Sequence, residues 1–223
     1  RPVGICPVCP MHKSNPWIIR NINRPSQIRI FVIKGQNLCI KHILDEIMQE
    51  YKTFPSEEIE VNVTCSIVRA LSLRRPVEFN MKKWVDRIQE IAQTSKDLPM
   101  KIRSLIIFAG YLYSEGNFQK LGIILESNKE IVHRKDIPPL NRLTFDWISA
   151  AYCNVMSLYD ECRKVVSDGL ELAHSLKINV MENMLLGHGM LSSLKKGDIE
   201  TAQRFLLEMA HTLSLIKPWE ASF

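Results

Sequence analysis

A helix–turn–helix pattern recurs three times in the second half of the chain, and its turns are regularly spaced. Gly116, Ser157 and Gly197 stand about 40 residues apart, a distance typical of helical repeats. The three copies share small or apolar residues at two further positions, namely Leu121, Cys162 and Ala202, and then Leu125, Val166 and Leu206. Repeats of this kind stack, and a stack provides an extended recognition surface rather than a reaction centre.

The composition favours helices over strands. The chain has 223 residues, of which 46% are hydrophobic and only 9 are glycine. No run of 18 apolar residues occurs, so we expect no membrane-spanning helix. The cysteines do not form a dense disulfide pattern, so we expect them to be reduced and the protein to be cytoplasmic. Residues 36–223 are therefore predicted to be all-α, an α-solenoid of stacked antiparallel helix hairpins that continues in a longer protein.

Residues 1–35 differ from this helical region. They hold five of the 11 prolines, six basic residues and no acidic ones. We expect an irregular segment with a short strand near residues 27–34. Six charges over this length are sparse for phosphate binding, and the remaining chain is nearly neutral, so direct nucleic-acid contact by the helical body is not expected.

Apolar periodicity and end signals predict nine helices. Ser56, Asp97 and Asp198 are the expected N-terminal caps, and Gly197 is an expected C-terminal cap. Glu57, Glu58 and Glu60 suit the positive end of the second helix rather than paired catalytic carboxylates. Eight of the predicted helices span about 37–52, 56–75, 97–114, 117–133, 139–156, 158–176, 179–195 and 198–214, and the remaining one begins near residue 80.

Two segments, 55–92 and 168–210, resemble stretches of large bacterial ATP-dependent transcription regulators. These are the signal-transduction ATPases with numerous domains, of the maltose-activator type. The likeness covers roughly residues 36–223 and rests on Trp84, the Leu185–Gly189 step and the Gly197–Asp198 turn. It implies a tetratricopeptide-like superhelix that senses an inducer or a partner, with an ATPase and a DNA-binding element elsewhere in the protein. Residues 1–35 do not match.

The first helix of each hairpin lines the concave wall of such superhelices, so its exposed residues are candidates for binding. Trp147 is the leading candidate for a ligand surface, although it also suits packing between repeats. Arg142 and Asp146 precede it on the same predicted helix, and Tyr152 follows. His188, between two glycines that suit close helix approach, either faces the same wall or is simply exposed.

A metal site is a weaker candidate. Cys6 and Cys9 have the spacing of two zinc ligands, and His12 and Cys39 could complete the set. The alternative is that Cys6 and Cys9 are incidental to a proline-rich arm. Cys39, Cys65, Cys153 and Cys162 lie in apolar helical patterns and are expected to be reduced core residues.

No nucleophile motif, phosphate-binding loop or two-histidine metal motif occurs, so we expect neither an enzyme nor a cofactor. The leading interpretation is a non-catalytic sensor and interaction scaffold of a bacterial transcription regulator, which binds a small-molecule inducer or a protein partner. The alternative is a free-standing adaptor for protein–protein interaction with no DNA role. The sequence leaves the oligomeric state open.

Overall fold

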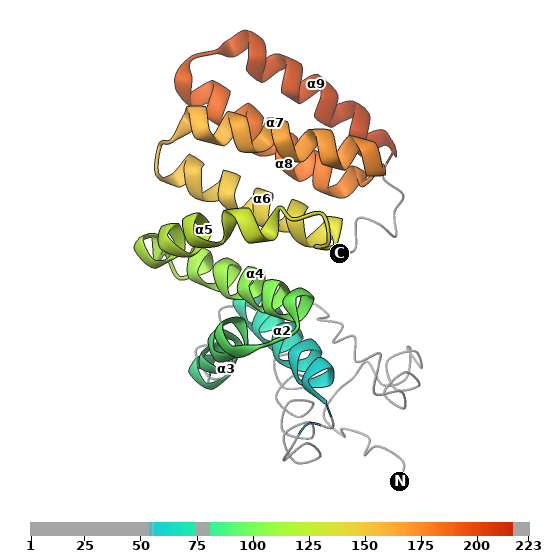
Figure 1. Cartoon of the computed structure of the whole chain (residues 1–223). Helices are drawn as coiled ribbons and strands as arrows, with labels where there is room; N and C mark the ends of the chain where they lie inside the picture. Colours follow the sequence, from blue (N-terminus) through green and yellow to red (C-terminus); the bar gives the residue numbers. More distant parts are fainter. Residues whose placement is uncertain (1–53, 55, 75–80, 216–223) are drawn as a thin grey trace, which may run out of the picture. The chain divides into compact units, whose positions relative to one another are not determined.

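The computed structural model describes residue 54 and residues 56–74 and 81–215 (Figure 1). All regular structure in these residues is α-helical, which confirms the predicted helical class for this part of the chain. The helices are α2 (Glu57–Arg74), α3 (Met81–Thr94), α4 (Leu98–Ser114), α5 (Phe118–Val132), α6 (Pro139–Val155), α7 (Tyr159–Leu176), α8 (Asn179–Lys196) and α9 (Ile199–Leu215). The helix predicted at 37–52, the strand at 27–34 and the boundary at residue 35 lie outside the described residues.

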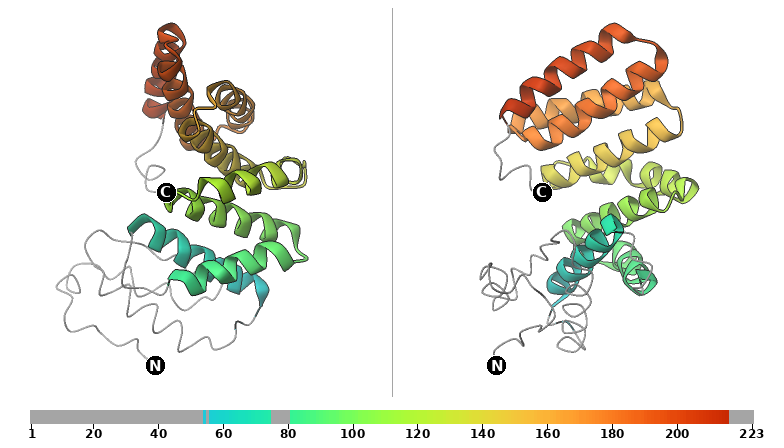
Figure 2. Two further views of the ribbon diagram at one scale, coloured as in Figure 1. Left: turned by 90° about the vertical axis from the view of Figure 1, so that its left-hand side faces the viewer. Right: turned by 180° about the vertical axis from the view of Figure 1, so that it is seen from behind.

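The described helices belong to two compact units. Helices α2 and α3 pack together in the first unit, Arg1–Lys96. Helices α4 to α9 form the second unit, Asp97–Phe223, in which each helix packs against the next one. In addition, α4 packs against α6 and α6 against α8, so the first helices of successive hairpins are neighbours; Figure 2 shows these hairpins from two further sides.

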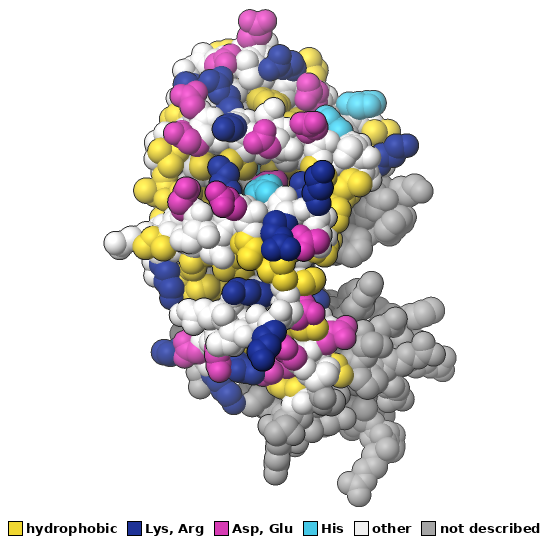
Figure 3. Space-filling model, in the orientation of Figure 1, with side chains coloured by type: hydrophobic (Ala, Val, Ile, Leu, Met, Phe, Trp, Pro, Cys, Tyr) yellow, Lys and Arg dark blue, Asp and Glu magenta, His cyan; other side chains and the backbone are white. Residues whose placement is uncertain are grey.

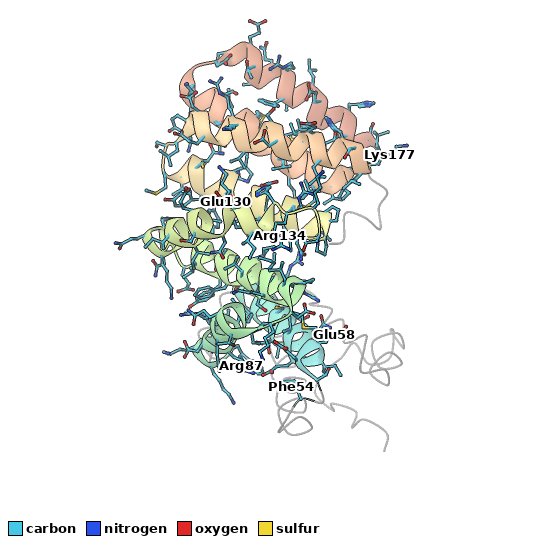
Figure 4. The ribbon with its side chains drawn as sticks, viewed as in Figure 1. Phe54, Glu58, Arg87, Glu130, Arg134 and Lys177 are labelled. Carbon is cyan, nitrogen blue, oxygen red and sulfur yellow. The ribbon has the colours of Figure 1, made fainter. Side chains whose placement is uncertain are left out.

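The three turn positions identified from the sequence share one backbone conformation. Gly116, Ser157 and Gly197 have φ angles of 73°, 62° and 77°. These values lie in the left-handed region, which reverses the chain after a helix and is favoured by glycine. The repeat register read from the sequence is therefore confirmed at its turns. Lys177, which joins α7 to α8 and is labelled in Figure 4, also has a positive φ, of 56°, which the sequence did not indicate.

Side-chain caps fix where three helices begin, as predicted. The Met100 amide donates to Asp97 Oδ1 over 2.9 Å at the start of α4. The Thr201 amide donates to Asp198 Oδ1 over 3.1 Å at the start of α9, and the Ile59 amide donates to the Ser56 hydroxyl at α2. Each cap of this kind stabilises a helix by about 1 kcal/mol.

Within the first unit, an ion pair joins its two described helices. Arg87 of α3 donates two hydrogen bonds to the Glu60 carboxylate of α2, over 2.6 and 2.8 Å (Figure 4 labels Arg87). A bidentate pair between arginine and a carboxylate has a defined geometry as well as charge attraction. Glu60 thus has a role beyond the helix-end complement expected from the sequence.

Close packing in the second unit depends on a small residue in α8. A Cβ atom placed on Gly189 would lie 2.9 Å from the Phe205 ring of α9 and 3.1 Å from Val166 of α7. The prediction that a glycine allows neighbouring helices to approach is confirmed for Gly189. It is wrong for Gly187, where an added Cβ would make only an ordinary 4.0 Å contact with Met209.

The positive φ angles of Lys177 and Gly197 predict opposite effects on stability when these two residues are substituted. Lys177→Gly should raise the free energy of unfolding by about 0.5 kcal/mol, because it removes the strain of a side chain at positive φ. Gly197→Ala should lower it by about 1 kcal/mol through strain alone, since an added Cβ meets no atom within 4 Å. Urea denaturation followed by helical circular dichroism measures both.

Gly187→Ala is the matched control for the alanine substitution. It lies inside α8, where alanine is favoured, so it should stabilise the fold by about 0.5–1 kcal/mol. Equal effects of Gly187→Ala and Gly197→Ala would contradict the assignment of strain to the turn.

Candidate interaction face on helices α6 and α8

Helix α8 carries apolar residues on its outward side as well as on its buried side, with Lys195 beside them at its C-terminal end. A surface helix ordinarily carries charged residues on the side away from the core. On α8, four apolar residues follow one another at helical spacing along the outward side, the last two of them exposed: Val180, Met184, Leu191 and Leu194. This stripe has more apolar surface than the packing of α8 requires.

Helix α6 carries a similar uncharged stripe. Leu140 and Val155 are exposed near its two ends, Thr144 and Trp147 are half-buried, and Ala151, on the same side between Trp147 and Val155, is buried. Residues at these spacings lie on one side of a helix. Trp147 therefore lies in the middle of this uncharged stripe, and part of its side chain packs against the core of the unit.

The two stripes adjoin because α6 packs against α8. The rings of Trp147 and His188 meet across this contact, with centroids 6.5 Å apart and planes inclined at 50°. We call the eight residues of the two stripes the α6–α8 face. None of them is charged. On the side of the molecule drawn in Figure 3, by contrast, acidic and basic side chains are interspersed over the described helices.

A buried amide lies beside this face. Asn154 Nδ2 donates to the backbone carbonyl of His188 over 3.2 Å, which ties α6 to α8. The same nitrogen is 3.3 Å from His188 Nδ1, and Lys195 Nζ donates to the Asn154 carbonyl over 3.1 Å. Burial lowers the pKa of His188, so its imidazole is neutral at pH 7. His188 therefore adds no charge at this edge of the face, and Lys195 is the charged group there.

The structure brings together two of the five predicted binding residues, Trp147 and His188. The other three point away from the α6–α8 face. Asp146 is buried and hydrogen-bonded to His133, which follows α5, and Arg142 lies one turn before Asp146, with its Nε buried. Tyr152 packs so closely on Gly122 of α5 that no Cβ would fit there.

The contact between Asp146 and His133 was not apparent from the sequence. His133 follows α5, and its Nε2 lies 2.8 Å from Asp146 Oδ1. Its Nδ1 lies 2.7 Å from the carbonyl oxygen of Lys129. Both ring nitrogens thus face acceptors, which suits the doubly protonated ring. The hydrogen bond to Asp146 raises the pKa of His133, against burial and the charge of Arg142.

The structure describes some of the cysteines but none of the candidate metal ligands at the start of the chain. Cys65, Cys153 and Cys162 are buried thiols, as expected for core residues. Burial raises the pKa of Cys153 to about 11, so it is a thiol rather than a reactive thiolate. The metal candidates Cys6, Cys9, His12 and Cys39 lie outside the described residues. Within residues 56–74 and 81–215, no group of three or more potential ligands has a metal-binding arrangement.

Comparison with known proteins assigns this chain to no family. No protein-family model matches the chain, and no curated protein matches it. Among the described helices, none is both long and apolar enough to cross a lipid bilayer.

The His133–Asp146 contact predicts a pH-dependent contribution to stability. The pKa of folded His133 lies above its ordinary value of 6.5, so the contact stabilises fully below that pH. This contribution disappears as the pH rises through the higher pKa of the folded state. His133→Gln should cost about 1–3 kcal/mol near pH 6 and should reduce the fall in stability toward alkaline pH.

Urea denaturation at a series of pH values measures this effect. His211→Gln, at an exposed site on α9, is the matched control and should keep the wild-type profile. An unchanged pH profile in His133→Gln would show that His133 is not protonated in the fold.

Proposed function

We propose that this chain is a non-catalytic interaction scaffold. In this proposal, hairpins α4–α5, α6–α7 and α8–α9 stack as a tetratricopeptide-like α-solenoid, and the α6–α8 face binds a partner. The observation that carries the proposal is the uncharged, partly exposed stripe on each of two adjacent helices. Contiguous apolar surface of this kind is typical of interaction sites.

The chemistry of the face favours a protein partner. The stripes run along two helices of 17 and 18 residues, which is a long surface for a small molecule. Recognition of an amphipathic helix uses apolar anchors at helical spacing, and the α6–α8 face offers apolar positions along its whole length. A small inducer remains the second ligand class, and it would suit the region around Trp147 and His188.

The cellular setting that we propose is a bacterial transcription regulator of the signal-transduction ATPase type. The resemblance of segments 55–92 and 168–210 supports it, together with the repeat register. Such a regulator requires that binding favour one arrangement of the array over another. Sequencing the coding regions on both sides of this chain tests the setting. An adjoining ATPase or DNA-binding domain supports it, and flanks with neither favour the free-standing adaptor.

A charge placed in the α6–α8 face should weaken partner binding. We suggest that the immobilised chain capture partners from an extract of the source organism, and that each captured protein be purified and titrated by calorimetry. Leu191→Glu should reduce affinity at least tenfold, which is about 1.4 kcal/mol, because it buries a carboxylate in an apolar contact.

Leu215→Glu is the matched control, because it adds the same charge at an exposed leucine on α9. It should bind like the wild type. If neither Leu191→Glu nor Leu194→Glu weakens binding more than the control does, the α6–α8 face is not the binding surface.

A further inference from the structure

Arg142 is a half-buried cation whose charge is not balanced by a neighbouring carboxylate. It lies near the start of α6, and its Nε atom is buried without a hydrogen-bond partner. Its guanidinium forms no ion pair with any residue in the ranges 56–74 and 81–215. A guanidinium keeps its charge at every physiological pH, so burying part of it without a partner costs free energy. A bound anion is one way in which such a group is satisfied.

The carboxylates closest to Arg142 in the chain are engaged by other cations. Asp146 lies one turn further along α6, at a spacing that often pairs an arginine with a carboxylate, but its Oδ1 lies 2.8 Å from His133 Nε2. Asp136, in the loop before α6, accepts two hydrogen bonds from Arg134 over 3.0 and 2.7 Å (Figure 4 labels Arg134). The sequence has no other acidic residue between the end of α5 and the end of α6.

The contact between His133 and Asp146 leaves an excess of positive charge beside Arg142. Both ring nitrogens of His133 face acceptors, so the ring is doubly protonated and Asp146 balances its charge. The hydrogen bond to Asp146 raises the pKa of His133, and the Arg142 charge is close enough to lower it in part. Two cations therefore share one carboxylate at this place in the fold.

We propose that Arg142 binds an oxyanion, namely a carboxylate or phosphate group of a ligand, where the start of α6 meets the end of α5. The planar guanidinium donates two parallel hydrogen bonds to such a group, and it does so with the same geometry for both kinds of anion. The bound anion supplies the negative charge that Asp146 gives to His133 instead. Arg142 points away from the α6–α8 face, so this inference does not rest on the function proposed for that face.

The number of donors sets the expected strength. A single arginine provides one fork of hydrogen bonds, and the site is partly open to solvent. We therefore expect a free inorganic anion to bind with a dissociation constant on the order of 1 mM. A ligand that carries the anion on a larger body gains further contacts and binds more tightly.

Titration of the full chain with sodium phosphate and, separately, with sodium acetate tests the site. Sodium chloride keeps the ionic strength constant, and the amide NMR signals of α6 report binding. We expect saturable shifts of the signals around Arg142 with at least one of the two anions. Saturation by phosphate alone indicates a phosphorylated ligand, saturation by acetate alone indicates a carboxylate ligand, and saturation by both supports an oxyanion site without choosing between them.

Substitution of Arg142 should weaken this binding. Arg142→Gln removes the charge and the fork of donors, so affinity should fall at least tenfold. Arg142→Lys keeps the charge but loses the planar fork, so its affinity should lie between those of the wild type and Arg142→Gln. Arg204→Gln is the matched control, because it removes the same charge at an exposed site on α9 and should bind like the wild type.

His133→Gln tests the role of the shared carboxylate while Arg142 stays in place. It leaves Asp146 without its cation and one turn from Arg142, where the two can pair, so anion binding should again fall at least tenfold. Helical circular dichroism checks that each variant is folded. Shifts that fail to saturate with either anion, or equal binding by the wild type and Arg142→Gln, would overturn the proposal.

Discussion

Each hairpin of the second unit depends on one residue with a positive φ angle between its two helices. Gly116, Ser157 and Gly197 supply this conformation, and each ends one helix within two residues of the start of the next. A reversal this short places the two helices side by side. Glycine adopts it without strain, whereas Ser157 adopts it at a cost that the surrounding packing must offset.

Once the helices are side by side, small residues determine how closely they pack. Gly169 lies against Leu185 of α8, and Gly189 lies against Phe205 of α9, with no room for a methyl group at either glycine. Close approach lets large side chains from three helices fill one core. The core is thus complete without Leu191 or Leu194, which is why their apolar character calls for an explanation outside the core.

The sequence predicted local features, such as where helices end, and missed contacts between residues that lie far apart in the chain. Helix ends agree within about two residues, because caps such as Asp97 and Asp198 act on amides three residues away. The sequence named Trp147 and His188 as separate candidates and did not predict that their rings meet. Nor did it predict the His133–Asp146 contact, because this depends on how the end of α5 meets the middle of α6. No periodicity encodes such a contact, and a histidine after a helix was its only signal.

The exposed apolar residues of α6 and α8 differ from those of α9 in how they correspond to equivalent positions in the other hairpins. Leu140 and Val180 occupy equivalent positions on α6 and α8, and so do Thr144 and Met184; all four are at least partly accessible to solvent. The other four residues of the α6–α8 face are not related in this way, because Leu191 and Leu194 correspond to the buried Ala151 and Asn154, and Val155 corresponds to Lys195. The face is therefore specific to the sequences of α6 and α8. Leu206 on α9, by contrast, is exposed, whereas its equivalents Leu125 and Val166 are buried on helices that α6 and α8 cover. The same position in the repeat is therefore buried or exposed according to which helices pack on it.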